Sequence, residues 1–371
     1  MVCDDAASTA DPLIVRQHPK AAAMIISRTP FRISFFGGGT DYEPWFREHG
    51  GAVLSTTIDK YCYINCRYLP PFFEHKFRVV WSEIERVVTR DEIRHPVMRA
   101  VLELLEIDEG IEIHHNGDLP ARSGLGSSSS FTNGMLLASY ALLGRMICKR
   151  ELAERAIHVE QVLLKENVGV QDQIATAYGG FNKILIAPNG GFSVEPVIAP
   201  PSRMAAFHEH LLLFFTGVSR NASEIAGEQI ASIGKKQSEL HAMRAFVDDG
   251  ERILTGSADL AEFGRLLHEG WQIKRGLSSK ISPAAVDDIY DKARKAGATG
   301  GKLLGAGGGG FVLFFAPPEA HPRIMAALGD LIHVPFDLET GGAQLIHYDP
   351  PNIRPARARA AGTLPLKVAA S

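Results

Sequence analysis

The stretch 120–134, PARSGLGSSSSFTNG, places glycines and serines immediately before an apolar run. A helix N-terminus offers unpaired N–H groups and a partial positive charge. Glycines ahead of it let the backbone close around phosphate oxygens, and serine hydroxyls add donors. The stretch therefore indicates an anion-binding loop, although it has neither the Gly-Lys-Ser/Thr of a Walker A loop nor GxGxxG. The alternative is a flexible turn with a serine N-cap.

Two acidic residues and one basic residue could complete such a site. Asp172 lies in GVQDQ, Glu160 lies on the amphipathic helix expected before it, and Arg32 lies in RTPFRISFF. A carboxylate near a phosphate loop is typical of a metal ligand or a proton acceptor, and an arginine can hold an anion. Simpler readings stay open, since Glu160 also fits a solvated helix face and Asp172 a helix N-cap.

Two further glycine-rich segments are candidates for ligand contact. Residues 37–41 read GGGTD after an expected strand, where the acidic residue could accept hydrogen bonds from ligand hydroxyls or simply cap the turn. Glycines also crowd residues 301–310. Ordering such a loop costs conformational entropy. We therefore expect its backbone to approach a ligand or another chain segment closely.

The remaining patterns predict the elements that position these segments. Runs of β-branched and aromatic residues predict strands at 24–28, 32–36, 52–58, 61–67, 111–115, 211–215 and 311–315. Apolar spacing predicts helices at 97–107, 131–144, 151–166, 223–246, 260–275 and 283–297. Together they indicate an α+β fold with two layered domains. A cluster of Pro and Gly near residue 200 indicates a boundary between two domains, at 24–200 and 201–350. We expect flexible tails at 1–23 and 351–371.

Composition narrows the class of protein. The chain has 371 residues, 45% of them hydrophobic, a net charge of −3 and no long basic run, which argues against nucleic-acid or anionic-membrane partners. It lacks the apolar core of a signal peptide and a run of about 18 apolar residues, so we expect a cytoplasmic protein. Four cysteines fit a reducing compartment. Cys62 and Cys66 fit buried thiols on a strand better than a zinc pair.

The order of these motifs resembles that of the GHMP kinases, the family of galactokinase, homoserine kinase, mevalonate kinase and phosphomevalonate kinase. The matching pieces are PxRxxxxGxxTDY, PxxxGLGSSS and KLLGAGGGG, and the resemblance covers about residues 24–348. Four other segments resemble those of the bacterial D-glycero-D-manno-heptose 7-phosphate kinases: FFGGGTDYEPW, GVQDQIATAYGGFN, LLLFFTGVSRNASEIA and GWQIKRGLSSKIS.

The resemblance implies a fold and a set of roles. The fold would be an N-terminal ribosomal-protein-like α+β domain and a C-terminal ferredoxin-like domain, with the active site between them. Asp172 would accept the proton of the attacking hydroxyl, while Arg32 would lower the pKa of that hydroxyl and steady the phosphoryl group. Ser128 and Glu160 would ligate Mg²⁺, although the spacing from Glu160 to Asp172 is one residue longer than in mevalonate kinase. The residues expected to bind ATP are Gly124, Leu125, Gly126, Ser127, Ser128 and Ser129.

One departure from galactokinase points to the acceptor. Where galactokinase reads GEHTDY, this chain reads GGGTDY, so Gly38 and Gly39 replace a Glu and a His that lie near the far hydroxyls of the sugar. Their absence leaves room and removes repulsion toward a phosphate. The resemblance therefore implies ATP-dependent phosphorylation of the anomeric C1 hydroxyl of D-glycero-D-manno-heptose 7-phosphate. The 1,7-bisphosphate product would serve activated-heptose synthesis for surface polysaccharides such as capsule. The expected substrate-binding residues are Gly37, Gly38, Gly39, Thr40, Asp41, Arg220, Lys274, Arg275 and Gly308.

Other functions stay open at this point. The chain could be another GHMP sugar kinase acting on an unphosphorylated sugar such as fucose or galactose, or a catalytically inactive sugar or nucleotide sensor. Retention of the catalytic and metal-binding candidates argues against the sensor, and the double glycine argues against galactokinase. Arg220, Lys274 and Arg275 could each be solvated instead of holding a phosphate. We expect a sugar phosphate and ATP as partners, with a homodimer as one candidate assembly.

Overall fold

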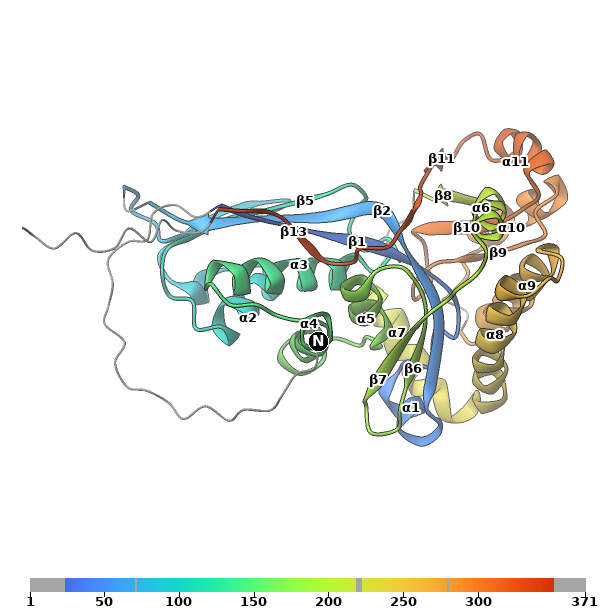
Figure 1. Ribbon diagram of the computed structural model, residues 1–371, viewed down its shortest axis with the longest axis horizontal. Coiled ribbons are helices and arrows are strands. Elements are labelled where there is room, and N and C mark those ends of the chain that lie inside the picture. The colour runs from blue at the N-terminus through green and yellow to red at the C-terminus, as the bar shows by residue number, and fades with distance from the viewer. Residues whose placement is uncertain (1–23, 71, 218–221, 279, 350–371) are drawn as a thin grey trace, which may run out of the picture.

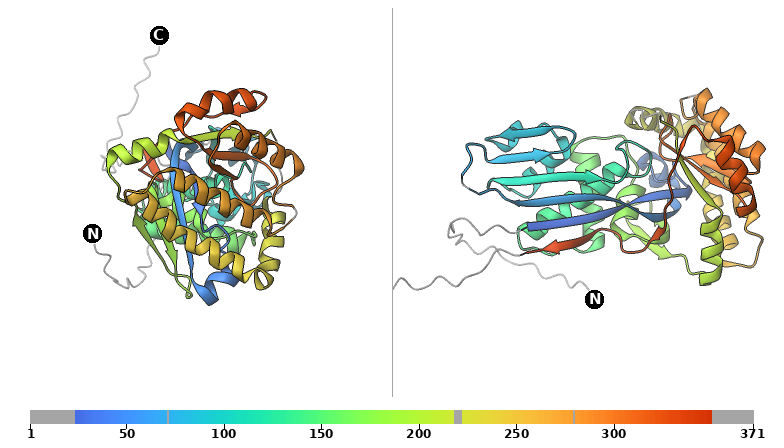
Figure 2. Two further views of the ribbon diagram at one scale, coloured as in Figure 1. Left: turned by 90° about the vertical axis from the view of Figure 1, so that its right-hand side faces the viewer. Right: turned by 90° about the horizontal axis from the view of Figure 1, so that it is seen from above.

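The computed structural model describes residues 24–70, 72–217, 222–278 and 280–349. Two sheets and their covering helices form an elongated molecule, with the larger sheet along its length and the smaller sheet at one end (Figures 1 and 2). The expected tails at 1–23 and 351–371 lie outside the described residues.

Within the described residues, the larger sheet has nine strands, which are β1 (Met24–Phe36), β2 (Gly51–Tyr68), β3 (Phe77–Val80), β4 (Ile84–Val87), β5 (Ile111–Gly117), β6 (Phe181–Ile186), β7 (Phe192–Pro196), β12 (Leu338–Glu339) and β13 (Gln344–Tyr348). Their order is β13-β1-β2-β5-β3-β4, with β6 and β12 also paired to β2, and β7 paired to β6. The strands expected separately in β1 and in β2 are continuous. Cys62 and Cys66 are buried free thiols on β2, as predicted.

The strand β1 is irregular on both sides of Arg32 and Ser34. Its pairing with β2 shifts register between Pro30 and Phe31 and again between Ser34 and Phe36. A bulge of this kind bends a strand and redirects its side chains. Arg32 and Ser34 lie between the two shifts, and because they are two residues apart they share one face of the strand.

Helices cover one face of the larger sheet (Figure 1). They are α2 (Pro96–Leu104), α3 (Ser127–Leu142), α4 (Lys149–Ile157) and α5 (Gln171–Tyr178). α3 lies directly under β1 and β2 and is buried on nearly every side, which explains its apolar and small residues. The helix expected at 151–166 is α4 followed by a π-helical turn, η2 (His158–Leu163). Among the described helices, none is long and apolar enough to cross a membrane.

The smaller sheet is antiparallel, in the order β11 (Ile332–His333), β8 (Leu211–Phe215), β10 (Phe311–Phe315) and β9 (Gly300–Leu303). The helix expected at 223–246 is two helices separated by a short 3-10 turn. Besides α2 to α5, the described helices are α1 (Glu43–His49), α6 (Pro201–Glu209), α7 (Ala222–Ser232), α8 (Gln237–Thr255), α9 (Ala261–Arg275), α10 (Ala284–Ala296) and α11 (His321–Ala327). The 3-10 turns are η1 (Arg90–Glu92), η3 (Ile233–Lys235) and η4 (Pro318–Ala320).

The two halves share a core. Phe35 at the end of β1 stacks on Phe181 at a ring-centroid distance of 5.3 Å and meets Phe207 and Phe263 edge to face. The strands β12 and β13 also return to the larger sheet, where β13 covers the edge that β1 would otherwise expose. The predicted segment 201–350 therefore contributes two strands to the first sheet and does not fold as a unit separate from it.

Candidate active site

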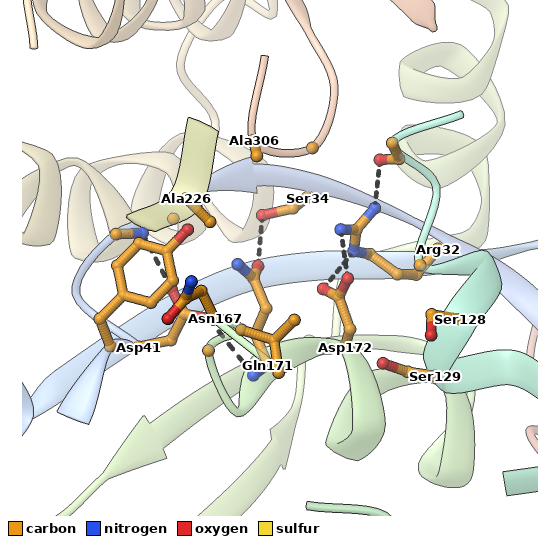
Figure 3. A pocket seen from close by; sticks show the side chains of 18 of the residues that line it. Arg32, Ser34, Asp41, Ser128, Ser129, Asn167, Gln171, Asp172, Ala226 and Ala306 are labelled. Carbon is orange, nitrogen blue, oxygen red and sulfur yellow. Dashed lines mark hydrogen bonds and ion pairs between the residues drawn. The ribbon is translucent and has the colours of Figure 1, made fainter. Parts of the chain in front are cut away.

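A cavity of about 260 Å³ lies where the two halves meet. Its walls come from the end of β1, the first turn of α3, the residues before and at the start of α5, and the glycine-rich loop between β9 and β10. In Figure 3 the labelled residues run from Asp41 through Gln171 and Asp172 to Ser128 and Ser129. The cavity therefore extends from the turn at 37–41 to the start of α3.

The loop before α3 has the conformation that an anion site requires. Gly124 and Gly126 have φ of 85° and 74°, a left-handed backbone that favours glycine, and α3 then begins at Ser127, so that its first turn, with N–H groups unpaired within the helix, lines the cavity. A Cβ on Gly124 would lie 2.4 Å from the carbonyl oxygen of Leu304. The glycine is therefore required by the close approach of the second glycine-rich loop.

The second glycine-rich loop closely approaches another chain segment, which is one of the two outcomes expected from its composition, and that segment is the loop before α3. A Cβ on Gly305 would lie 2.5 Å from the Cα of Gly124, and one on Gly310 would lie 2.2 Å from the carbonyl oxygen of Ser123. The N–H of Phe311 donates to the same carbonyl at 3.2 Å. The two loops thus pack backbone against backbone, which only residues without side chains allow.

An arginine–aspartate pair occupies the middle of the cavity wall (Figure 3). Arg32 donates from Nε to Oδ1 of Asp172 and from Nη2 to Oδ2, both at 2.7 Å, and from Nη1 to the carbonyl oxygen of Gly124, also at 2.7 Å. The backbone N–H of Arg32 donates to the carbonyl of Leu125 at 2.9 Å. Arg32 is 3% exposed and therefore fixed between the carboxylate and the loop before α3.

Glu160 is a buried carboxylate at the end of the cavity where α3 begins. It accepts hydrogen bonds from the hydroxyls of Ser129 (3.0 Å) and Thr132 (2.7 Å) and from Nε2 of Gln173 (2.5 Å). Burial, with a smaller contribution from the charge of Glu166, raises the pKa of Glu160 to about 7. Among the described residues, no lysine, arginine or histidine forms an ion pair with it. A buried carboxylate of this kind needs a cation beside it.

The π-helical turn η2 explains how Glu160 reaches the cavity. A π-helical turn contains one residue more than the α-helical turn it replaces. Glu160 lies in this turn, and both Glu160 and Asp172 line the cavity. Ser128, the other expected Mg²⁺ ligand, also lines the cavity but is exposed, and the hydroxyls that donate to Glu160 are those of Ser129 and Thr132.

One hydroxyl, one carboxylate and ATP phosphates form a set of hard oxygen donors that fits Mg²⁺. Glu160 accepts three hydrogen bonds, and a carboxylate has about four acceptor positions, so one stays available. Among the described residues, no group of three His, Cys, Asp or Glu side chains is arranged as a metal site of its own. The arrangement fits a metal that arrives with a nucleotide.

The turn at 37–41 divides into structural and cavity-lining residues. A Cβ on Gly37 would lie 1.9 Å from the carbonyl oxygen of Ala52, and the hydroxyl of Thr40 donates to the carbonyl of Gly37 at 2.8 Å. Gly39 has φ 104° and its N–H donates to Oδ1 of Asp41 at 2.8 Å. Burial raises the pKa of Asp41, while the Gly39 N–H opposes this rise. Gly38, Gly39 and Asp41 line the cavity.

Two buried lysines approach the cavity from the second half of the chain. Lys274 on α9 donates from Nζ to the carbonyl of Gly305 at 2.5 Å, and burial lowers its pKa to about 8. Lys302 on β9 donates to the carbonyls of Ser34 and Phe35, both at 2.7 Å, which ties the second half to β1. Burial and then the neighbouring Lys274 lower the pKa of Lys302 well below its usual range.

The cavity contains only some of the residues that the sequence suggested. Arg275 pairs with Asp287 at 2.9 Å and does not line the cavity, because consecutive residues of a helix point about 100° apart and Lys274 takes the cavity side. Arg220 lies outside the described residues. The other expected residues absent from the cavity lining have backbone or packing roles: Gly37, Thr40, Leu125 and Gly308.

The sequence interpretation missed several lining residues. Lys302 had a usable signal, since it is the one charge in the run GGKLLGAGGGG at the base of the glycine-rich loop. Gln171 and Ser34 adjoin residues already singled out, and they form a hydrogen bond with each other at 2.8 Å. Asn167 and Gln229 lie in segments that showed no motif.

Comparison with known proteins agrees with this fold and site. The chain matches the GHMP kinases N terminal domain over residues 93–180 and the GHMP kinases C terminal domain over residues 252–331. These matches define a kinase with a GHMP kinase N-terminal domain and a GHMP kinase C-terminal domain. The chain belongs to the GHMP kinase family and is a phosphotransferase.

Two curated relatives that each match 82% of this chain are named as a heptose 7-phosphate kinase and a fucokinase. D-glycero-alpha-D-manno-heptose 7-phosphate kinase of Campylobacter jejuni is 28% identical over 317 residues, which cover 82% of this chain and 93% of that relative. L-fucokinase/L-fucose-1-P guanylyltransferase of Bacteroides fragilis is 30% identical over 82% of this chain, which spans 36% of that longer protein. A solved D-glycero-D-manno-heptose 1-phosphate kinase from Bacteroides thetaiotaomicron has the same fold, with a TM-score of 0.71, 24% identity and coverage of 86% of this chain and 98% of that one.

Proposed function

We propose that this GHMP kinase is a sugar-phosphate kinase that transfers the γ-phosphoryl group of ATP to the anomeric C1 hydroxyl of D-glycero-D-manno-heptose 7-phosphate. The observation that carries the proposal is that Gly38, which has no side chain, lines the same cavity as the Arg32–Asp172 pair. Gly38 does not have the left-handed backbone of its neighbours, and a Cβ there would meet only Gln171 Nε2 at 3.6 Å and Ser34 Oγ at 3.9 Å. The backbone therefore does not require this glycine, and its missing side chain leaves room for an acceptor.

The residues of the cavity fit in-line phosphoryl transfer. The acceptor oxygen would form the new bond to the γ-phosphorus, the bond to the leaving oxygen of ADP would break, and Asp172 would take the hydroxyl proton. Arg32, held by Asp172 and by the carbonyl of Gly124, lies between the two reactants and would stabilise charge on the phosphoryl group. The N–H groups at the start of α3 would hold the phosphates.

Ser128 and Glu160 would hold Mg²⁺ when it enters with ATP. The ion would neutralise phosphate charge. Glu160 would then be an ionised carboxylate beside a cation, which relieves the cost of its burial.

The name of the Campylobacter jejuni relative supports a heptose 7-phosphate acceptor. Lys274, which lines the cavity, is the described residue that we propose as a partner for the distal phosphate. The product would be the 1,7-bisphosphate, an intermediate suited to activated-heptose synthesis. We propose a cytoplasmic location and capsule or a related surface polysaccharide as its use.

A specific observation favours a second candidate, a kinase for an unphosphorylated sugar such as fucose. Among the described basic residues proposed for the distal phosphate, Arg275 is paired with Asp287 and Lys274 already donates to a carbonyl. The fucokinase activity named for the Bacteroides fragilis relative fits the same cavity without a phosphate partner.

An ATP-consumption assay over a panel of acceptors separates the two candidates. The panel contains D-glycero-D-manno-heptose 7-phosphate, the free heptose, mannose, mannose 6-phosphate, fucose and galactose, each with Mg²⁺. The proposal expects the heptose 7-phosphate to give the highest kcat/KM, with phosphate added at C1. The highest value with fucose or galactose would replace it by the second candidate.

A further inference from the structure

The side chain of Gln171 is held in one orientation at the floor of the cavity. Its Oε1 accepts a hydrogen bond from the hydroxyl of Ser34 at 2.8 Å, and its backbone N–H points at Oδ2 of Asp41 at 3.4 Å. Gln171 is the first residue of α5, directly before Asp172, so its backbone is fixed by the helix that positions the expected proton acceptor.

The donor end of this amide points at the space above Gly38. A Cβ built on Gly38 would lie 3.6 Å from Nε2 of Gln171, closer than any other atom beyond its chain neighbours. Among the described residues, no group accepts a hydrogen bond from Nε2, and the atom is not sealed from solvent. Because Ser34 satisfies the oxygen end, the two N–H bonds are free for a ligand.

Gln171 lies beside the reacting groups on the side away from the phosphate loop. Figure 3 shows Gln171 between Asp172 and Asp41, with Ser34 above its amide. An acceptor whose hydroxyl reaches Asp172 therefore places its next atoms over Gln171 and Gly38.

We infer that Gln171 is a specificity-determining residue, whose Nε2 donates to an oxygen of the acceptor in the space that Gly38 leaves open. Ser34 is a positioning residue, because it acts by holding the amide. The acceptor class is a polyol or sugar that carries an oxygen next to the reacting hydroxyl. The inference rests on the proposed function only in taking a sugar as the acceptor, and not in the identity of that sugar.

The test compares Gln171→Leu, Gln171→Glu, Ser34→Ala and the double variant Ser34→Ala/Gln171→Leu. Steady-state KM is measured separately for ATP and for the acceptor that gives the highest turnover in the panel above. Gln171→Leu and Gln171→Glu should raise the acceptor KM about tenfold, the size expected when one hydrogen bond is lost and a partner is left unpaired. The KM for ATP should change less than about twofold. The matched control is Gln272→Leu, an exposed glutamine on α9 outside the cavity.

The double variant separates positioning from independent contacts. Ser34→Ala alone should raise the acceptor KM, and adding it to Gln171→Leu should cause no further rise, because both remove the same contact. Additive effects would overturn the positioning role of Ser34. An acceptor KM unchanged in Gln171→Leu, or a KM for ATP that rises in parallel, would overturn the role of Gln171.

Two further outcomes are informative. If Gln171→Leu does not fold, Gln171→Asn withdraws the amide by one methylene and should raise the acceptor KM in the same way, and a native value would overturn the inference. If heptose 7-phosphate is not a substrate but Gln171→Leu raises the KM of another sugar, the proposed substrate fails and the inference about Gln171 stands.

Discussion

Replacing Glu160 by glutamine should stabilise the metal-free protein above neutral pH. Glu160 is fully buried, and among the described residues no cation pairs with it. The rise of its pKa from 4.5 to about 7 corresponds to about 3 kcal/mol at about 1.4 kcal/mol per pKa unit. Glutamine has nearly the same shape and does not ionise, so the variant should avoid most of this cost.

The sign of the effect follows from the two pKa values. Below pH 4.5 the carboxyl is protonated in both the folded and the unfolded chain and does not alter stability. As the pH rises from 4.5 to about 7 the unfolded chain loses its proton first, so the native protein becomes less stable relative to the variant. Above pH 7 the difference is complete.

The hydrogen bonds around the site should survive the substitution. The glutamine oxygen can accept from Ser129 and Gln173, and its NH₂ can donate to the hydroxyl of Thr132. That hydroxyl also lies 3.1 Å from the carbonyl oxygen of Ser128, to which it can donate instead. We therefore expect little loss from unpaired groups to offset the gain.

The assay is urea unfolding at pH 5 and pH 8 in EDTA, for the native protein, Glu160→Gln and the control Glu103→Gln, which changes an exposed residue of α2. The stability gap between Glu160→Gln and native should widen by about 2 kcal/mol between the two pH values, whereas Glu103→Gln should track native. Mg²⁺ with a non-hydrolysable ATP analogue should stabilise native more than Glu160→Gln. An equal gap at pH 5 and pH 8 would refute the argument.

Four other substitutions test the remaining parts of the site. Asp172→Asn should keep ATP binding and lower turnover about 10²–10⁴-fold, and a soluble variant with nearly native turnover would remove the proton-acceptor role. Ser128→Ala should raise the Mg²⁺ concentration needed for half-maximal activity, so an unchanged Mg²⁺ titration would exclude Ser128 as a ligand. Gly37→Ala should lower the urea midpoint, because its Cβ would lie 1.9 Å from a carbonyl oxygen. Gly38→Ala should keep the native urea midpoint and weaken acceptor binding. Equal urea midpoints for the two variants would contradict the assignment of Gly37 to a structural role and Gly38 to the cavity.

The parts of the site that the sequence predicted are local in the chain. The glycine-rich loop before α3 and the start of α3 follow from glycines and serines placed directly before an apolar run. Such residues determine the backbone conformation within a few residues of themselves. A close approach of the second glycine-rich segment to a ligand or to another chain segment was predicted, and the structure shows which segment it contacts, the loop before α3. The strands and helices that were predicted have the predicted type, but the continuity of β1 and of β2 and the break between α7 and α8 were not predicted.

The parts that the sequence could not predict depend on packing between distant segments. The choice between Lys274 and Arg275 is made by the phase of α9 against the rest of the fold, which periodicity alone does not fix for two adjacent basic residues. The return of β13 to the edge of β1 is a pairing of residues more than 300 apart, such as Arg28 with Gln344. Glu160 was predicted on an α-helix, and the π-helical turn that carries it has no simple sequence signal.

The central claim is that the acceptor carries a phosphate at its distal end, and the ratio of kcat/KM for D-glycero-D-manno-heptose with and without its 7-phosphate tests it most directly. Two charge-assisted hydrogen bonds to that phosphate would be worth about 1.5–3 kcal/mol each. The account therefore predicts a preference of about 10²-fold or more for the 7-phosphate, narrowed in Lys274→Ala. Equal values of kcat/KM for the two compounds would contradict it and favour a kinase for unphosphorylated sugars.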